Sequence, residues 1–510
     1  MSQNLIEKAF SKSPESYWIA STPETNYPAL AEDIKTDILI VGGGITGINT
    51  AYLLQKEGFD VTIIDSGRIA LSTSGHTTAK ITSLHDLKYS RLINQLGSEG
   101  AYKYGEINQN AILMIEKIIS ENKIQCDFSR QPSYVYTQDE KYIEEIEKEV
   151  NAASSIDLPA SYKSTIPLPI EIQGAVCFEN QAQFHPRKYL LALADVFVKN
   201  GGHIYENTTA LDIHKDRDCI TSTRNGLSIT SGKVVIASHF PFYDGGGLYS
   251  ARMFPERSYV IAVKAPVNVP GGMYISYENP IRSVRTQPLE KDEQLLIIGG
   301  EHHKTGQDDC EKYHYTNLIK FADDNFKATE APYRWSAQDY TAMNEIPFIG
   351  PISANSISIF IATAFQKWGM TTSAVSAMII KEFITTGKSY VEEIFSPSRF
   401  TPVSSAKNFV KENLNVADNL ISGKLQKLQE DINLELGEGK AVQFDGKKAG
   451  AYRDMDGNLF IVDTTCKHLG CEVHWNSAEK TWDCPCHASR YSYDGTVIEG
   501  PALRPLDRLR

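Results

Sequence analysis

The sequence predicts an α/β domain with a parallel sheet, interleaved along the chain with an antiparallel-sheet domain and followed by a small all-β domain. Three observations lead to this prediction. Residues 36–65 have the pattern of a buried strand, a glycine turn, a helix and a second strand. Residues 257–300 contain β-rich segments, and residues 425–510 combine strand patterns with Asp-Gly turns. A length of 510 residues allows two to three such domains.

The first element is the βαβ unit TDILIVGGGITGINTAYLLQKEGFDVTIID at residues 36–65. Gly42 makes the tight turn, Gly44 lets backbone approach a pyrophosphate, and Gly47 lets the helix pack on the strand. Asp65 ends the second strand, where it can accept hydrogen bonds from ribose hydroxyls. A glycine-rich turn without a ligand is the alternative, but the strand, the helix and the terminal acid all match. We therefore predict a Rossmann-type site for a dinucleotide.

The middle of the chain alternates between the two domains. Helical patterns near residues 102–122 and 140–154 precede a helix, a Gly-Gly stop and a strand at residues 185–208. Residues 233–238 (KVVIAS) supply another short buried strand, whereas residues 257–300 have the pattern of an antiparallel sheet. We therefore expect two interleaved domains.

Charge and hydropathy exclude several classes of partner. The formal net charge is −12, from 51 Lys and Arg against 63 Asp and Glu, so nucleic-acid phosphates and anionic lipids are repelled. The chain has no run of about 18 apolar residues and no N-terminal apolar h-region. We expect no nucleic-acid partner, no membrane span and a cytoplasmic location. Four of the eight cysteines lie close together near the end of the sequence, which in the cytoplasm favours a metal site over a disulfide scaffold.

Four stretches within residues 15–400 resemble the D-amino-acid oxidase and glycine oxidase superfamily of FAD oxidoreductases. They are VGGGITG at 41–47 with Asp65, STSGHTTAKIT at 72–82, NQAQFHPRKYLLALA at 180–194 and ATAFQKWGMTTSAVSAM at 362–378. The resemblance implies that the dinucleotide is FAD. It also implies that a small substrate, an amine or an amino acid, lies between the flavin and the antiparallel sheet.

In that family the last stretch forms a strand, a loop and a helix whose N-terminus lies at the pyrimidine end of the flavin. The helix dipole stabilises the anionic reduced ring there. By this resemblance, the loop contacts the cofactor through Trp368, Gly369, Met370 and Thr371. The segment along the flavin contacts it through Thr77 and Thr78. Ala364 is a departure, because relatives often carry glycine at this place.

The expected division of the chain follows from these patterns. Residues 1–400 form the FAD-dependent oxidoreductase domain, residues 401–425 a helical linker, and residues 426–510 the small all-β domain. Within the first domain, the FAD-binding parts lie near 35–85, 170–240 and 345–390, and the substrate part near 90–165 and 241–340.

Two loops, CKHLGC at 466–471 and CPCHAS at 484–489, predict that residues 426–510 form a Rieske 2Fe-2S domain. Each loop offers one cysteine and one histidine as metal ligands, namely Cys466, His468, Cys484 and His487. Zinc accepts two thiolates and two imidazoles, but zinc ribbons and fingers usually pair each cysteine with another cysteine a few residues on. A Rieske cluster takes two cysteines on one iron and two histidines on the other. The spacing therefore favours a Rieske cluster.

Cys471 and Cys486 remain, one in each loop. Resemblance to the Rieske proteins of respiratory and photosynthetic complexes implies a disulfide between them. In the high-potential members, a serine and a tyrosine that follow the second histidine ligand donate hydrogen bonds to the cluster, and Ser489 and Tyr491 occupy those places. We therefore expect a potential in the upper part of the Rieske range of about −150 to +300 mV. Loop packing is the alternative for both residues, and Ala488 departs from the glycine of many relatives.

The two cofactors differ in the number of electrons that they carry. A flavin accepts two electrons from a donor, and a Rieske cluster passes one electron at a time. We predict an FAD-dependent amine or amino-acid dehydrogenase that passes electrons from reduced flavin through the cluster to an external one-electron carrier or quinone. Two alternatives remain: a flavin oxidase that uses oxygen, with the cluster as a side port, and a non-catalytic redox sensor or electron carrier.

Few residues stand out as candidates for catalysis or substrate binding. Arg282, Arg285 and Arg334 lie in or near segments where relatives bind a substrate carboxylate, and a structural ion pair is the alternative for each. Lys367, beside the flavin loop, is placed to tune the reduced flavin or its reaction with oxygen. His76 lies where some relatives attach flavin covalently.

The stretch EHHKTGQDD at 301–309 suggests a mononuclear iron site of the kind found in oxygenases. Adjacent histidines on a strand point to opposite sides, and the sequence offers no convincing set of two histidines and one carboxylate. We therefore disfavour oxygenase chemistry.

Overall fold

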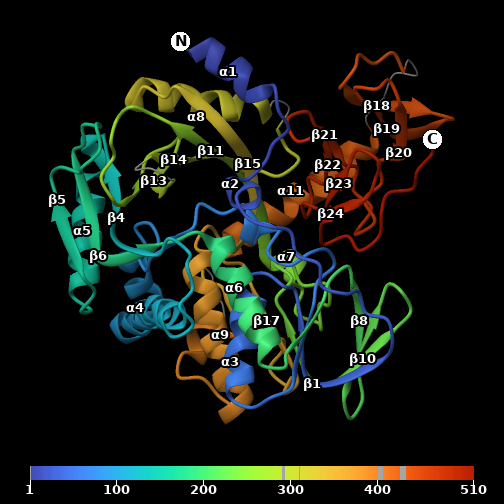
Figure 1. Cartoon of the computed structure of the whole chain (residues 1–510), viewed down its shortest axis with the longest axis horizontal. Coiled ribbons are helices and arrows are strands. Elements are labelled where there is room, and N and C mark those ends of the chain that lie inside the picture. The colour runs from blue at the N-terminus through green and yellow to red at the C-terminus, as the bar shows by residue number, and fades with distance from the viewer. Residues whose placement is uncertain (1, 290–292, 309–310, 400–405, 426–431) are drawn as a thin grey trace.

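The computed structural model describes residues 2–289, 293–308, 311–399, 406–425 and 432–510 (Figure 1). Residues 401–405 of the expected linker, residues 426–431 of the expected terminal domain and residue 309 of the 301–309 stretch lie outside the described residues. Two large sheets form the body of the protein, and two small sheets lie beside them.

The first large sheet has eight strands and is mostly parallel. Its parallel strands follow the order β17 (Ile359–Thr363), β10 (Ser228–Ile236), β1 (Ile34–Val41), β2 (Val61–Ile64) and β7 (His203–Tyr205). Antiparallel additions are β16 (Phe348–Pro351) on β17 and the hairpin of β8 (Ala210–Lys215) and β9 (Cys219–Thr223) on β10. All four residues of strand β2 (VTII) are buried, as expected for a parallel strand that is covered on both faces.

Helices cover one face of this sheet. Helix α3 (Ile45–Lys56) contacts both α6 (Pro186–Lys199) and α9 (Gly369–Thr386). Alternate residues of β1 separate two cores, because Ile38 and Ile40 pack with these helices whereas Leu39 and Val41 pack with residues of the β8–β9 hairpin. Both faces of β1 are therefore covered, and the carboxyl ends of the parallel strands are where the sheet meets the cavity.

The second large sheet has nine strands and is mostly antiparallel. Its order is β15 (Glu330–Ala342), β11 (Met253–Lys264), β14 (Gln294–Lys304), β13 (Arg282–Pro288), β12 (Met273–Ser276), β4 (Ser129–Thr137), β6 (Gly174–Gln183) and β3 (Lys80–Ile81), with β5 (Ala160–Lys163) also on β6. The sheet curls, since Lys80 of the edge strand β3 reaches Ser283 of β13 with a hydrogen bond of 2.5 Å. The curl makes a half-barrel that opens toward the parallel sheet.

Helices flank the half-barrel and connect it to the parallel sheet (Figure 1). They are α1 (Ser2–Phe10), α4 (Tyr89–Glu121), α5 (Ile143–Ser154) and α8 (Glu311–Phe326). Short helical turns complete the first 400 residues: α2 (Tyr17–Ala20), α7 (Tyr249–Arg252), α10 (Glu392–Phe395), η1 (Thr73–Gly75) and η2 (Glu140–Tyr142). The order of strands along the chain confirms that the two domains are interleaved.

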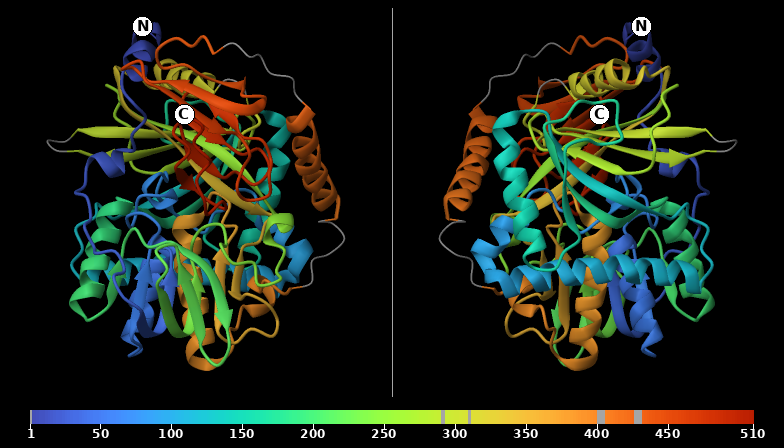
Figure 2. Two further views of the ribbon diagram at one scale, coloured as in Figure 1. Left: turned by 90° about the vertical axis from the view of Figure 1, so that its right-hand side faces the viewer. Right: turned by 90° about the vertical axis from the view of Figure 1, so that its left-hand side faces the viewer.

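The C-terminal part begins with helix α11 (Ala406–Leu425) and continues into two small antiparallel sheets (Figure 2). The first contains β18 (Gly439–Phe444), β19 (Lys447–Arg453) and β20 (Leu459–Asp463), and the second contains β21 (His474–Asn476), β22 (Thr481–Asp483), β23 (Arg490–Ser492) and β24 (Val497–Glu499). Each sheet has its own small core. The predicted all-β character of this part is confirmed.

A search of the described residues for membrane spans finds no helix with the length and apolar character needed to cross a bilayer.

The central parallel strand gives a test of this packing. Ile40 is fully buried, whereas Ile357 is 75% exposed. We expect Ile40→Ala to lower the free energy of unfolding by about 2–5 kcal/mol, because the smaller side chain leaves a cavity in the core. The matched Ile357→Ala variant should change it by less than about 0.5 kcal/mol. Urea unfolding followed by circular dichroism measures both, and equal effects would contradict the assigned burial.

Candidate active site and metal centre

A cavity of about 980 Å³ lies between the carboxyl ends of the parallel strands and the half-barrel. Its walls include the glycine turn, residues 65–68 and 71–74, and the half-barrel strands β11 and β14. The small β domain closes one side with residues 497–503. The glycine turn, the half-barrel and the small β domain therefore share one cavity.

The glycine turn is shaped for a close approach by a ligand. Gly42 has a φ of +115°, and a side chain there would meet the carbonyl oxygen of Ala237 at 2.5 Å. A side chain at Gly47 would collide with the carbonyl of Gly42, so only glycine lets α3 pack this closely. Gly44 forms the N-cap of α3 without a side-chain cap and lines the cavity. The helix N-terminus is therefore open toward an anionic group such as a pyrophosphate.

Asp65 lies directly after β2 in the cavity wall. Its two carboxylate oxygens accept hydrogen bonds from the backbone N–H groups of Gly43 at 2.7 Å and Gly67 at 2.8 Å. Burial raises the pKa of this carboxyl group, and the two backbone bonds oppose that rise. Each oxygen keeps a lone pair for a ribose hydroxyl, so the side chain fits a dinucleotide.

Residues 76–78 run along the cavity and are held from behind by two tryptophans. The indole N–H of Trp18 donates to the carbonyl of Thr77 at 2.7 Å, and that of Trp335 donates to the carbonyl of His76 at 2.8 Å. The side chains of His76, Thr77 and Thr78 line the cavity. The segment is thus fixed by buried hydrogen bonds while one side stays open to a ligand.

The loop before α9 reaches the opposite side of the cavity. Trp368, Gly369 and Met370 line it, and Trp368 stacks on His85 with ring centroids 4.9 Å apart. Thr371 does not line the cavity, because its hydroxyl donates to the carbonyl of Thr82 and accepts from the Thr82 N–H. That hydroxyl therefore joins the two cavity segments.

Both alanines that replace a family glycine adopt left-handed backbone conformations. Ala364 has a φ of +62° and Ala488 a φ of +61°. A left-handed residue with a Cβ costs roughly 1–2 kcal/mol. The two positions therefore keep the backbone that glycine would adopt, at a cost in strain beside each cofactor region.

The structure does not support a substrate-binding role for the predicted arginines. Arg285 is directed away from the cavity and donates to backbone carbonyls, including that of Ala79 at 2.8 Å. Arg334 donates to the carbonyls of residues 9 and 12, and Arg282 pairs with Glu301 at 2.5 Å. The three guanidinium groups therefore stabilise the fold through backbone carbonyls and one ion pair. The carbonyls of Ala79 and of residues 9 and 12 lie more than 200 residues from their arginines in the sequence, so no local motif indicated these roles.

Lys367 does line the cavity, but its charge is already compensated. Its ammonium donates to the hydroxyl of Ser258 at 2.9 Å and lies 3.6 Å from Glu256 and 3.8 Å from Asp339. Lys80, by contrast, was not predicted as a site residue, and it lies in the same wall with only hydroxyl partners. A two-residue strand carries no periodic signal that could have identified it.

The side chains that could bind iron in and near the 301–309 stretch already have hydrogen-bond partners. Both ring nitrogens of His314 are bound, at 3.0 Å by Glu301 and at 3.1 Å by Asp308. His303 stacks on His314 and has both of its own nitrogens bound. Although these side chains come within 4.8 Å of one another, their contacts are those of a hydrogen-bond network.

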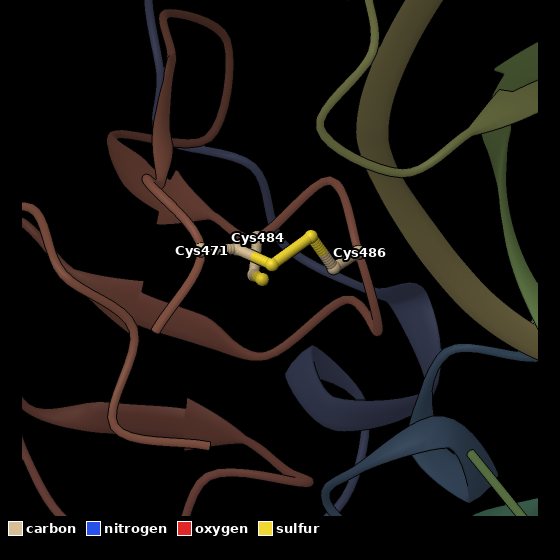
Figure 3. Close-up of side chains that lie close together, drawn as sticks. All are labelled: Cys471, Cys484 and Cys486. Carbon is tan, nitrogen blue, oxygen red and sulfur yellow. A yellow bond between two sulfur atoms is a disulfide. The ribbon is translucent and has the colours of Figure 1, made fainter. Parts of the chain in front are cut away.

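The four cysteines of the two C-terminal loops lie in the core of the small β domain. Figure 3 shows three of them, Cys471, Cys484 and Cys486, close together. Cys466 and Cys484 are buried, free thiols, and a hydrogen bond from Cys484 is the largest of several effects that lower the pKa of Cys466 to about 6. Cys471 and Cys486 form the disulfide that the resemblance implied. Two buried thiols, one of them readily ionised, suit binding of a soft metal.

His468 and His487 complete this cluster of side chains. Their ring centroids lie 4.9 Å apart, and burial lowers the pKa of each to about 4, which keeps the imidazoles neutral as metal ligation requires. The Nδ1 atom of His468 is buried without a hydrogen-bond partner among the described residues. An orphaned imidazole nitrogen beside two thiols fits the donor set of a [2Fe-2S] cluster with cysteine and histidine ligands.

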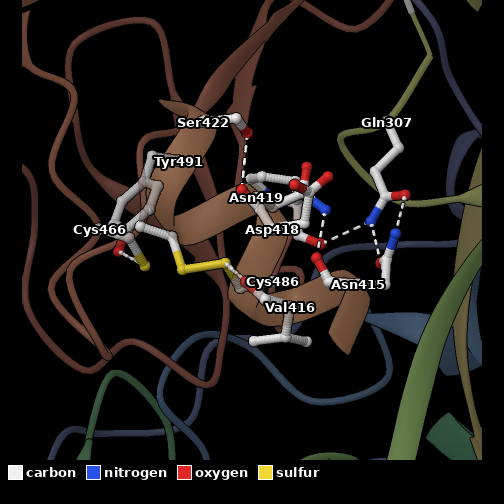
Figure 4. Close-up of a disulfide and its surroundings, with 11 residues drawn as sticks. Gln307, Asn415, Val416, Asp418, Asn419, Ser422, Cys466, Cys486 and Tyr491 are labelled. Carbon is white, nitrogen blue, oxygen red and sulfur yellow. Dashed lines mark hydrogen bonds between the residues drawn. A yellow bond between two sulfur atoms is a disulfide. The ribbon is translucent and has the colours of Figure 1, made fainter. Parts of the chain in front are cut away.

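Further side chains support the loops from behind. The hydroxyl of Tyr491 lies 3.2 Å from the Sγ of Cys466 and accepts the Lys467 N–H, and the Ser489 hydroxyl accepts the Ala502 N–H at 2.9 Å. Figure 4 shows that α11 covers the disulfide, with Cys486 directed at the carbonyl of Val416. The cluster region is therefore enclosed by protein on this side.

The small β domain docks on the half-barrel next to the cavity. The hydroxyl of Tyr340 donates to the carbonyl of His487 at 3.2 Å, and Gln338 donates to the carbonyl of Ala488 at 3.0 Å. The ring of Phe240 lies edge-on to His468 with centroids 5.9 Å apart. Phe240 and Tyr340 also line the cavity, so His468 and His487 lie on the side of the small β domain that packs against the cavity wall.

A buried ion network reinforces the docking. Arg490 contacts three carboxylates, those of Asp483 at 3.2 Å, Glu499 at 3.4 Å and Glu479 at 3.5 Å. Arg257 of β11 reaches the same Glu499 at 3.5 Å, which extends the network across the domain boundary. Although burial alone lowers the pKa of Arg490, the carboxylates raise it. The charges are therefore compensated within the interface.

Comparison with known proteins agrees with this geometry. The family model described as FAD dependent oxidoreductase (DAO) matches residues 37–383, and the Rieske [2Fe-2S] domain model matches residues 425–510. YhfW of Bacillus subtilis (strain 168), named for a Rieske 2Fe-2S centre, is 44% identical over 501 residues that span 98% of each chain. Gamma-glutamylputrescine oxidoreductase of Escherichia coli (strain K12) is 23% identical over 385 residues, 72% of this chain and 88% of its own.

The crystal structure of glycine oxidase from Geobacillus kaustophilus has the same fold over 72% of this chain and 100% of its own, with a TM-score of 0.61 and 17% identity. The family matches and the residues of the two sites agree on the cofactors, FAD in the cavity and a Rieske cluster in the small β domain. This chain therefore belongs to the DAO family of FAD-dependent oxidoreductases and carries a C-terminal Rieske [2Fe-2S] domain.

Proposed function

We propose that the enzyme is an amine or amino-acid dehydrogenase whose electrons leave through the Rieske cluster to an external one-electron carrier or quinone. Oxidation removes a hydride equivalent from the carbon beside the substrate nitrogen and a proton from that nitrogen, which leaves an imine. When bound, FAD supplies the two-electron acceptor and the cluster the one-electron carrier. The two electrons pass to the acceptor one at a time.

One observation carries this proposal: the small β domain forms part of the cavity wall. Residues 497–503 of that domain line the cavity together with the glycine turn and the loop before α9. The rings of Phe240 and Tyr340 lie between the cavity and the cluster region. The ring centroid of Phe240 is 5.2 Å from that of Tyr340 and 5.9 Å from that of His468. Packed aromatic side chains, rather than open solvent, therefore separate the two centres.

The residues proposed to hold each cofactor follow from the geometry above. For FAD, we propose Gly42, Gly44, Gly47 and Asp65 at the pyrophosphate and ribose, and Thr77, Thr78, Trp368, Gly369 and Met370 around the flavin. Thr371, predicted as a cofactor contact, instead supports this loop through its hydrogen bonds to the Thr82 backbone. For the cluster, we propose the ligands Cys466, His468, Cys484 and His487. In domain terms, residues 1–400 bind FAD and substrate, and residues 426–510 bind the cluster, with residues 401–425 as the linker.

The relay is tested by anaerobic mixing of the FAD- and iron-loaded enzyme with a panel of amines and amino acids. We expect one substrate to bleach the flavin absorbance first and then to reduce the cluster, seen by electron paramagnetic resonance. A bleached flavin beside an oxidised cluster, with peroxide formed on adding oxygen, would favour the oxidase alternative. No reduction by any member of a broad panel would favour a sensor or carrier.

The ligand set is tested by Cys466→Ala, which removes one thiolate from the proposed cluster. We expect loss of the Rieske resonance signal and of bound iron, while the true substrate still bleaches the flavin, because the cluster acts after the flavin. The matched control is Cys219→Ala, since Cys219 is equally buried but belongs to the β8–β9 hairpin. Retention of full iron and signal by Cys466→Ala would disprove this ligand assignment.

The hydroxyl beside Cys466 is expected to raise the cluster potential. Tyr491→Phe removes a hydrogen bond that stabilises the added electron. A bond of about 1–1.5 kcal/mol corresponds to a potential roughly 40–60 mV lower for a one-electron couple. Redox titration of the cluster measures the shift. Tyr493→Phe is the control, because its ring packs on Tyr452 instead, and an equal shift in both variants would rule out the specific role of Tyr491.

A further inference from the structure

Lys80 is a buried basic side chain in the wall of the cavity. Only 8% of the residue is exposed, and its ammonium donates to the hydroxyls of Thr78 at 3.0 Å and Ser283 at 2.5 Å. Both partners are neutral. An ammonium has three N–H donors, so two bonds leave one donor without a described partner in a side chain that lines the cavity.

Two other cations of the same cavity, Lys367 and Arg91, already have carboxylate partners, and Lys88 donates to the carbonyl of Glu345 and the amide oxygen of Gln366. Lys367 lies within 4.0 Å of Glu256, and Arg91 lies 2.9 Å from Glu345. Among the residues that the structure describes, Lys80 makes no ion pair within that distance. A buried charge without a counter-ion is costly, and an incoming anionic group would remove most of that cost.

The surroundings of Lys80 have a measurable consequence for its charge. Burial and the nearby guanidinium of Arg285 lower the pKa of its ammonium to about 7. Tyr259, His302 and Lys367 line the same cavity but do not contribute to this shift. Above pH 7 the free enzyme therefore holds Lys80 mostly as a neutral amine, and a bound anion favours the protonated form.

We propose that Lys80 binds a carboxylate of the substrate, so that the enzyme acts on an amino acid or another carboxylate-bearing amine and not on a simple amine. This inference rests on the proposed function, because it places the substrate in the cavity. It also assigns the charge pairing that the predicted arginines cannot supply, since Arg285 and Arg334 donate to backbone carbonyls. Lys80 is thus a specificity-determining residue on β3.

The test uses benzoate, an unreactive carboxylate, titrated into the oxidised FAD-loaded enzyme and followed by the change in flavin absorbance. Lys80→Met keeps the length of the side chain but removes the charge, so we expect benzoate affinity to fall at least about tenfold. Arg91→Met removes a cation from the cavity rim that Glu345 already neutralises, and it should change the affinity by less than about threefold. Benzamide, which has no charge, should bind the wild-type and Lys80→Met enzymes equally.

A second measurement needs no variant. In weakly buffered solution at pH 8, benzoate binding should take up about one proton per site, and benzoate affinity should decrease as pH rises above 7. An unchanged benzoate affinity in Lys80→Met, or binding without proton uptake, would overturn the proposal. Loss of flavin from Lys80→Met, with normal benzoate affinity after reconstitution, would assign the residue to the cofactor instead.

Failure of this inference is distinguishable from failure of the relay. Benzoate binding involves neither turnover nor the cluster, whereas the relay is read from flavin bleaching and cluster reduction. Reduction of both centres by an amine without a carboxylate would support the relay and refute the role of Lys80. Proton-coupled benzoate binding in an enzyme whose cluster stays oxidised would support the role of Lys80 and refute the relay.

Discussion

The buried guanidinium of Arg490 in the Rieske domain holds Glu499, the carboxylate that Arg257 of the half-barrel reaches across the domain boundary. Taking a charge out of water is costly unless well-placed opposite charges surround it. Asp483, Glu499 and Glu479 provide those charges, and Glu499 also binds Arg257 of the half-barrel. The network therefore holds the second small sheet and the wall of the FAD cavity in one arrangement. Removal of Arg490 would leave Asp483 and Glu479 without their guanidinium partner, and removal of Arg257 would break the ion pair that crosses the domain boundary.

A fixed interface defines how the two redox centres face each other. The side of the small domain that carries His468 and His487 lies against Phe240 and Tyr340 of the FAD domain, while α11 covers the disulfide on another side. The proposed relay thus relies on packed side chains that hold the centres at a constant separation. Fusion in one chain also keeps the donor centre at a high effective concentration for the acceptor centre.

Local sequence patterns were sufficient for the fold and for much of the site. The turn at Gly42 and the carboxylate of Asp65 follow from steric and hydrogen-bonding requirements of a few adjacent residues, and the pairing of Cys471 with Cys486 followed from family resemblance. The roles of cations were not predictable in this way. Arg334 donates hydrogen bonds to backbone carbonyls near the N-terminus, more than 300 residues away in the sequence. Lys80 donates a hydrogen bond to Ser283, which lies on a distant strand. Long-range packing decides such roles, and no short motif records it.

The burial of the cluster loops has a consequence for how the protein matures. Cys466, Cys484 and His487 are each less than 10% exposed in the docked arrangement. His468, the fourth proposed ligand, is only partly buried, and the ring of Phe240 from the FAD domain lies beside it. Insertion of a cluster before the small domain docks is therefore the route that needs no opening of this interface.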